Sequence, residues 1–149
     1  MKQFLGRMYL RAFGWKTAGP LPDLKKCVVI AAPHTSNWDG AHMVAICWAL
    51  GLKMNWMAKH TLFRPPLGWL VKALGAVPID RRAPQGLVQQ MADLFEARDT
   101  LWLAVPPEGT RSKTEYWKSG FYAIAYEAKV PVLLGFLDFE NKVGGAQEY

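Results

Sequence analysis

The sequence lacks a long hydrophobic run, internal repeats and low-complexity segments. None of its apolar stretches reaches the roughly 20 residues that a membrane-spanning helix needs. The N-terminus has neither the continuous apolar segment nor the cleavage site of a secretory signal peptide. We therefore expect a cytoplasmic protein without spanning helices.

Cysteine is also scarce, with Cys27 and Cys47 the only two. Each falls in a predicted core element, so we expect free, buried thiols of the kind found in a reducing compartment. A metal site needs several ligands close together, and the sequence contains no such cluster. We therefore expect no metal.

Acidic residues are fewer than basic ones, with 12 Asp and Glu against 18 Lys and Arg, giving a net charge of +6. This balance favours an anionic partner, and both nucleic acid and anionic lipid qualify. No nucleic-acid-binding motif is present and the basic residues are scattered, so we expect no nucleic acid. Seven Trp and six Met suit apolar ligands or a membrane surface.

The most informative stretch surrounds His34. The apolar run at 27–32 predicts a buried strand, and residues 41–50 predict a buried helix, with Asn37 and Asp39 as candidate N-caps. An Asp five positions after a His can contact one ring nitrogen and leave the other basic. That spacing alone is weak, because a loop histidine and a capping aspartate would give the same pattern.

A second polar loop, VPPEGTRS at residues 105–112, follows the predicted strand at 101–105. Two strand exits therefore carry polar side chains, one supplying a base and the other a cation. In α/β folds ligands bind at this edge of the sheet. The two loops together favour a catalytic site.

Strands and helices are predicted to alternate along a single domain of 149 residues. Further strands are expected at 53–58, 76–79 and 130–139, followed by a turn into another strand. Helices are expected at about 65–74, from Gly86 onwards with Leu87, Met91, Leu94 and Phe95 inward, and at about 118–129. Gly51 and Gly75 should end the helices before them. This order predicts an α/β fold with a largely parallel sheet flanked by helices.

The first 18 residues are predicted to contain an amphipathic helix. Its apolar face would consist of Phe4, Leu5, Met8, Tyr9, Ala12 and Phe13, and its cations are Lys2, Arg7, Arg11 and Lys16. Two interpretations stay open: the helix packs on its own domain, or it lies on an anionic membrane surface.

Four blocks, in this order, resemble the glycerolipid (lysophospholipid) acyltransferases of the 1-acylglycerol-3-phosphate acyltransferase type. They are residues 34–39 (HTSNWD, an H-x4-D motif), 75–81 (GAVPIDR), 107–111 (PEGTR) and 130–134 (VPVLL). The resemblance covers about residues 1–139 and is greatest to short bacterial members. The chain departs from the family at Leu134, where a second proline is usual, and its C-terminal end is expected to be shortened.

This resemblance implies transfer of a fatty acyl group from acyl-CoA or acyl carrier protein to the hydroxyl of a lysophospholipid. His34 would be the general base and Asp39 would orient it. The residues implied in, or proposed for, substrate binding are Arg81, Glu108, Gly109, Thr110, Arg111, Asn37, Trp38 and Lys118. No cofactor is implied beyond the acyl donor, and the protein is expected to lie peripherally on the inner face of an anionic membrane.

Other residues are given less specific roles. Ser36 is too close to His34 for an obvious nucleophile–base pair, and no G-x-S-x-G elbow is present. His42 is predicted to be packed and neutral. His60 is predicted to be solvated, with contact to an anionic acyl donor as the alternative. The tryptophans at 15, 48, 56, 69, 102 and 117 are assigned mostly to the core.

The alternative function is a catalytically weak, peripheral lipid-binding protein.

Overall fold

The computed structural model describes residues 1–18, 22–31, 37–79, 86–105 and 120–148, with only the backbone for residues 31, 37–40, 147 and 148. The elements are α1 (Lys2–Phe13), β1 (Lys16–Thr17), β2 (Lys26–Ala31), α2 (Asn37–Ala49), β3 (Met54–Lys59), the 3-10 helix η1 (His60–Phe63), α3 (Gly68–Ala73), β4 (Ala76–Ile79), α4 (Gly86–Ala97), β5 (Leu101–Val105), α5 (Gly120–Ala128), β6 (Val132–Asp138) and β7 (Val143–Glu148). None of the described helices is long and apolar enough to cross a membrane.

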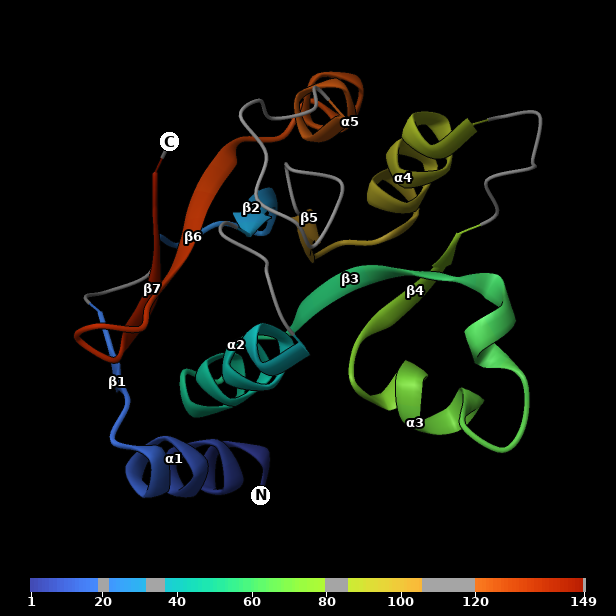
Figure 1. The fold of residues 1–149 in the computed structure, drawn as a ribbon. Helices are drawn as coiled ribbons and strands as arrows, with labels where there is room; N and C mark the ends of the chain where they lie inside the picture. Colours follow the sequence, from blue (N-terminus) through green and yellow to red (C-terminus); the bar gives the residue numbers. More distant parts are fainter. Residues whose placement is uncertain (19–21, 32–36, 80–85, 106–119, 149) are drawn as a thin grey trace.

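One seven-stranded sheet runs through the molecule in the order β1-β7-β6-β2-β5-β3-β4. All neighbouring strands are parallel except β6 and β7, which form an antiparallel pair. Helices α4 and α5 cover one face, and α1, α2 and α3 lie on the other (Figure 1). The predicted α/β fold with a largely parallel, helix-flanked sheet is therefore confirmed.

The face under α4 and α5 holds the largest hydrophobic cluster. Met91 and Phe95 of α4 and Ile124 of α5 are almost completely buried against Val28, Ile30 and Leu103 of the central strands. The inward positions predicted for α4 are confirmed, since Leu87 and Leu94 also pack on this cluster. Periodic apolar residues on a helix and β-branched residues on the strands produce one continuous core.

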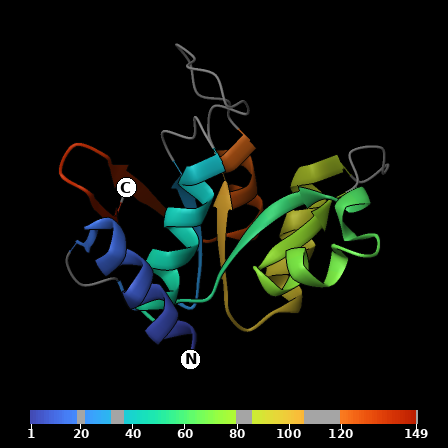
Figure 2. The same cartoon turned by 60° about the horizontal axis from the view of Figure 1, so that its bottom comes forward.

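The opposite face is covered in separate pieces. Helix α1 packs on α2 through Gly6 and Leu10, and a Cβ at Gly6 would lie only 2.6 Å from the Ala45 carbonyl oxygen. A glycine is therefore needed for the close approach of the two helices. Turning the view of Figure 1 by 60° about the horizontal axis brings α1, α2 and α3 forward, with α2 between the other two (Figure 2).

Several boundaries differ from those predicted. Helix α1 ends at Phe13, because Gly14 adopts φ +73° and its amide caps the last turn, so residues 16 and 17 are free to form β1. Helix α3 begins at Gly68, two residues after Pro66, and η1 precedes it. Gly51 and Gly75 end their helices in left-handed conformations, as predicted.

Candidate active site

The carboxyl ends of β2, β4 and β5 meet at one edge of the sheet. Ile30 is the register partner of Val105, and Lys59 at the end of β3 is the partner of Ile79 at the end of β4. In parallel strands this edge is where side chains and helix N-termini are free to bind ligands. The predicted convergence of these strand exits on one edge is therefore confirmed for the strands themselves.

The sheet order sets how far apart the three exits lie. Strands β2 and β5 are direct neighbours, whereas β4 is separated from β5 by β3. With about 4.8 Å between neighbouring strands, the ends of β2 and β5 lie about 5 Å apart, and those of β2 and β4 about 14 Å apart. The end of β5, which the PEGTR residues follow, thus lies beside the end of β2, which His34 follows. The end of β4, which Arg81 follows, lies farther away.

The predicted site residues themselves fall mostly outside the described ranges. These are His34, Arg81, Glu108, Gly109, Thr110, Arg111 and Lys118. Asn37, Trp38 and Asp39 are described by their backbone only, in the first turn of α2. Their roles therefore stay predictions.

The start of α2 corrects one expectation. Helix α2 begins at Asn37, so Asn37 and Asp39 are its first and third residues and neither is its N-cap. A carboxylate in the first turn of a helix is favourable because the helix dipole is positive there. The H-x4-D motif therefore runs from the strand exit into the first helical turn.

His42, one turn further along α2, is packed as predicted. Its ring is buried and stacks on Trp15 with ring centroids 4.6 Å apart. Its Nδ1 lies 3.2 Å from the Tyr9 hydroxyl, and Phe139 also contacts the ring. This aromatic cluster joins α1 and α2 near the end of the helix that bears Asp39.

His60 was predicted to be solvated, and the structure shows instead a half-buried ring. Its Nδ1 lies 3.3 Å from the carbonyl oxygen of Ile79, the last residue of β4, to which it donates. The imidazole thus lies at the same edge of the sheet, at the point where the Arg81 loop begins. His60 and Ile79 lie close together because β3 pairs with β4. The sequence does not indicate that these two strands are neighbours, so this contact could not be predicted from it.

Both cysteines are free and buried, as predicted. Burial raises the pKa of the Cys27 thiol and of the Cys47 thiol to about 12. Neither is a thiolate near neutral pH, so neither serves as a nucleophile. Within the described ranges, no three His, Cys, Asp or Glu side chains are grouped as metal ligands.

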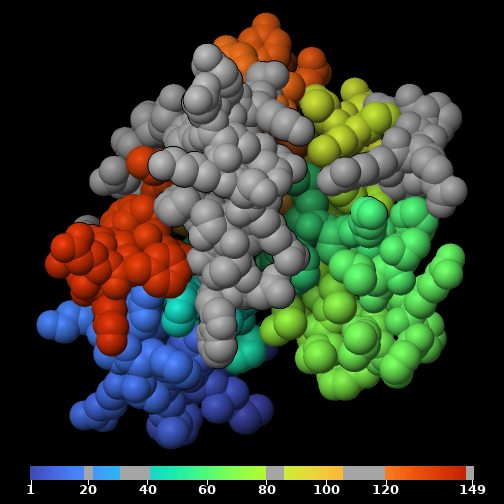
Figure 3. All heavy atoms as spheres, in the orientation of Figure 1, coloured from blue at the N-terminus to red at the C-terminus, as the bar shows by residue number. Residues whose placement is uncertain are grey.

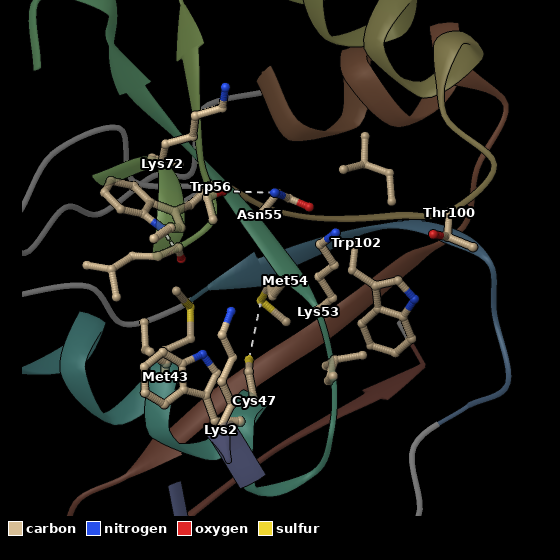
Figure 4. Close-up of a pocket in the computed structure, with 18 of the residues that line it drawn as sticks. Lys2, Met43, Cys47, Lys53, Met54, Asn55, Trp56, Lys72, Thr100 and Trp102 are labelled. Atoms are coloured by element: carbon tan, nitrogen blue, oxygen red, sulfur yellow. Dashed lines mark hydrogen bonds between the residues drawn. The ribbon is translucent and has the colours of Figure 1, made fainter. Parts of the chain in front are cut away.

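A groove of about 1120 Å³ lies along the sheet face between α2 and α3. Its floor comes from Met54, Trp56 and Trp102, and Met43 of α2 forms part of its wall (Figure 4). Lys2, Lys53 and Lys72 also line it. Trp56 donates its indole N–H to the Leu74 carbonyl at 3.1 Å and Asn55 donates to the Gly75 carbonyl at 3.0 Å, which fixes the turn after α3 against the sheet.

The sequence model of the family described as Acyltransferase matches residues 14–133, most of the chain and both of its polar loops. The chain belongs to the acyltransferase family. The resemblance inferred from the four sequence blocks is thereby confirmed.

Two relatives carry the same description, 1-acyl-sn-glycerol-3-phosphate acyltransferase. The protein of Streptococcus pneumoniae is 30% identical over 118 residues, covering 76% of this chain and 42% of that protein. The protein of Pseudomonas aeruginosa is 27% identical over 114 residues, covering 73% and 43% respectively. This acyltransferase-family chain thus spans less than half the length of these relatives.

A solved structure has the same fold. The crystal structure of the 1-acyl-sn-glycerophosphate (LPA) acyltransferase PlsC from Thermotoga maritima superposes with a TM-score of 0.68 over 99% of this chain and 66% of that one. The sequence identity is 18%, so this likeness concerns the arrangement of the helices and strands.

Proposed function

We propose that this acyltransferase-family chain transfers a fatty acyl group from a thioester, acyl-CoA or acyl carrier protein, to the hydroxyl of a lysophospholipid such as 1-acylglycerol-3-phosphate. The observation that carries the proposal is the family match across residues 14–133, which includes both the H-x4-D and the PEGTR loop. The descriptions of the two relatives support the choice of acceptor.

In the proposed reaction His34 takes the proton from the acceptor hydroxyl as its oxygen attacks the thioester carbonyl. The carbon–sulfur bond breaks, an ester forms, and the proton passes to the departing thiolate. Asp39 would hold the imidazole in the reactive orientation and support its charge when protonated. The thioester supplies the activation, so neither a metal nor a redox cofactor is required.

The phosphate of the acceptor would be held by Arg111 and Arg81, because a guanidinium can donate to two phosphate oxygens at once. Glu108 and Gly109 would contact the glycerol portion, and Thr110, Asn37, Trp38 and Lys118 would line the same region. Adjacent β2 and β5 support a short distance from Arg111 to His34. The greater separation of β4 supports an outer position for Arg81.

The groove between α2 and α3 suits an alkyl chain. Its floor is mainly apolar and it runs along the sheet toward Pro78 and Phe63, close to the carboxyl ends of β3 and β4. Burying each methylene in such a groove contributes about 0.8 kcal/mol. We propose that one acyl chain of the donor or acceptor lies there during transfer.

The proposal is tested by the release of free thiol from acyl-CoA and from acyl carrier protein, with and without 1-acylglycerol-3-phosphate. We expect release that requires the acceptor and that falls when the acceptor lacks its phosphate. Acceptor-independent release would indicate thioester hydrolysis and would contradict the assignment.

A second function, a peripheral lipid-binding protein with weak catalysis, is favoured by the exposed Phe4, Leu5 and Met8 of α1. In this case the chain would bind lysolipid vesicles in a flotation assay without releasing thiol from either donor. Binding and acceptor-dependent release together would reject this alternative.

A further inference from the structure

The segment from η1 to α3 exposes four large apolar side chains. Leu62, Leu67, Trp69 and Leu70 are between 41% and 73% exposed, Trp69 most of all. Trp69 was predicted to lie in the core, and the structure shows why it does not. Gly68 fills the buried position: its Cα lies so close to the Phe63 carbonyl that a Cβ there would overlap it. The next two residues of this short helix therefore point away from the protein.

The same segment carries positive charge without any negative charge. Residues 40–79 contain no Asp or Glu, whereas Arg64 and Lys72 are exposed on either side of the apolar group. We define the η1–α3 surface as Leu62, Arg64, Leu67, Trp69, Leu70 and Lys72. Apolar side chains between cations match the interface of an anionic bilayer, where phosphates lie above acyl chains. A tryptophan suits that boundary because its ring is apolar and its N–H is polar.

Helix α1 presents a surface of the same chemistry. Its exposed Phe4, Leu5 and Met8 lie among Lys2, Arg7 and Arg11, and residues 1–22 also contain no acid. Both α1 and α3 lie on the α2 side of the sheet (Figures 1 and 2). The space-filling view places both at the lower border of the molecule, α1 to the left and the η1–α3 segment to the right (Figure 3).

We propose that the η1–α3 surface is a second membrane-contacting surface, which binds the interface of an anionic bilayer together with α1. The groove lined by Lys2, Lys53 and Lys72 lies between the two surfaces. A bilayer that touches both would therefore lie over the groove, and two separated contacts would fix the orientation of the sheet relative to the lipid. This inference concerns membrane binding and does not require the acyl transfer proposed above.

An environment-sensitive fluorophore on Leu67→Cys tests the contact directly. Leu67 is 60% exposed, and the two native cysteines are buried with thiol pKa values of about 12, so labelling is confined to the new thiol. The matched control is Tyr126→Cys on α5, because Tyr126 is 71% exposed on the opposite face of the sheet. The probes are vesicles of phosphatidylcholine with and without phosphatidylglycerol.

We expect a blue shift and a rise in emission at position 67 with the anionic vesicles, and no change at position 126. Unchanged emission at position 67, while the protein sediments with the vesicles, would overturn the proposal. A shift at position 67 that needs no vesicles and grows with protein concentration would also overturn it, since it would indicate contact between two copies of the chain.

Vesicle co-sedimentation supplies a measurement free of the label. Trp69→Ser combined with Leu70→Ser should weaken partitioning by about tenfold or more, because two interfacial apolar side chains are lost. Tyr122→Ser with Tyr126→Ser, two exposed side chains on α5, should change it less than twofold. Equal losses for the two pairs would contradict a specific η1–α3 contact.

Discussion

The two faces of the sheet are built differently. Under α4 and α5 a single cluster of buried residues extends from β2 to β4, with Phe95 only 1% exposed, and partly buried residues of β6 pack against it. On the other face the buried residues form two smaller clusters, one between α1 and α2 and one around Cys27 and Trp102. The groove and the exposed apolar residues of α1 and α3 lie on this second face.

This difference indicates a division of labour within one small domain. A continuous core supplies most of the hydrophobic stabilisation, since burial contributes in proportion to the apolar area removed from water. The second face leaves apolar area uncovered, which costs stability but provides surfaces for apolar ligands. The proposed catalytic residues follow the carboxyl ends of the strands, at an edge of the sheet that is shared by its two faces.

The largest expected effect is on catalysis at that edge. His34→Ala should lower acyl transfer by about 10²–10⁴-fold, because the acceptor hydroxyl loses its general base. Asp39→Asn should lose less, since the base remains but is poorly oriented. Steady-state rates with saturating donor and acceptor measure both, and circular dichroism checks the fold. A near-normal rate for His34→Ala would refute the mechanism.

The contrast between faces predicts a difference in stability. Phe95→Ala should lower the free energy of unfolding by about 3–5 kcal/mol, because it leaves a cavity in the continuous core. Trp69→Ala, on the other face, should change it by less than about 0.5 kcal/mol, since this side chain is 73% exposed. Urea denaturation of both variants measures the difference. Comparable losses would mean that Trp69 is packed in solution.

The positions of the strand ends rank the two arginines. Arg111→Ala should raise the acceptor KM by about tenfold or more and Arg81→Ala by less, because β5, which Arg111 follows, lies beside β2, which His34 follows. The donor KM should stay nearly constant in both, and Arg→Lys should restore binding in part. The readout is initial rates with phosphorylated and unphosphorylated acceptors. Equal losses for the two acceptors would assign the arginines a structural role.

The smallest effects concern single cations on the second face. Arg7→Gln and Arg11→Gln should each weaken binding to anionic vesicles by about 1 kcal/mol, or about fivefold, and added salt should reduce the effect. Lys129→Gln, exposed after α5 on the opposite face of the sheet, is the control and should change binding little. Vesicle co-sedimentation at two salt concentrations separates these outcomes.

Much of the fold could be predicted because its signals are local. The β-branched strands β2 and β5, the periodicity of α4, and glycines such as Gly51 report their structure directly. Strand β1 has two residues and η1 has four, too few for any periodic signal, so both were missed. The apolar pattern of α1 predicted a helix, but Gly6 decides which side packs on α2, and that depends on a contact with another element.

For the candidate site, the sequence proposes residues but not their geometry. The H-x4-D and PEGTR motifs make His34, Asp39 and Arg111 candidates because the chemistry restricts the residue types, and their roles stay predictions. How closely their loops approach each other depends on sheet order, and nothing in the sequence states that β2 and β5 are neighbours. The position of His60 beside the end of β4 has the same origin.

The most direct test of the account follows a labelled acyl group through one turnover. The full chain would be mixed with acyl-CoA labelled in its acyl carbon and vesicles containing 1-acylglycerol-3-phosphate, then quenched at successive times. Direct attack by the acceptor hydroxyl predicts that label passes from the thioester to diacylglycerol phosphate, never onto the protein, and that His34→Ala stops this transfer. Label bound covalently to the chain, or released as free fatty acid, would contradict it.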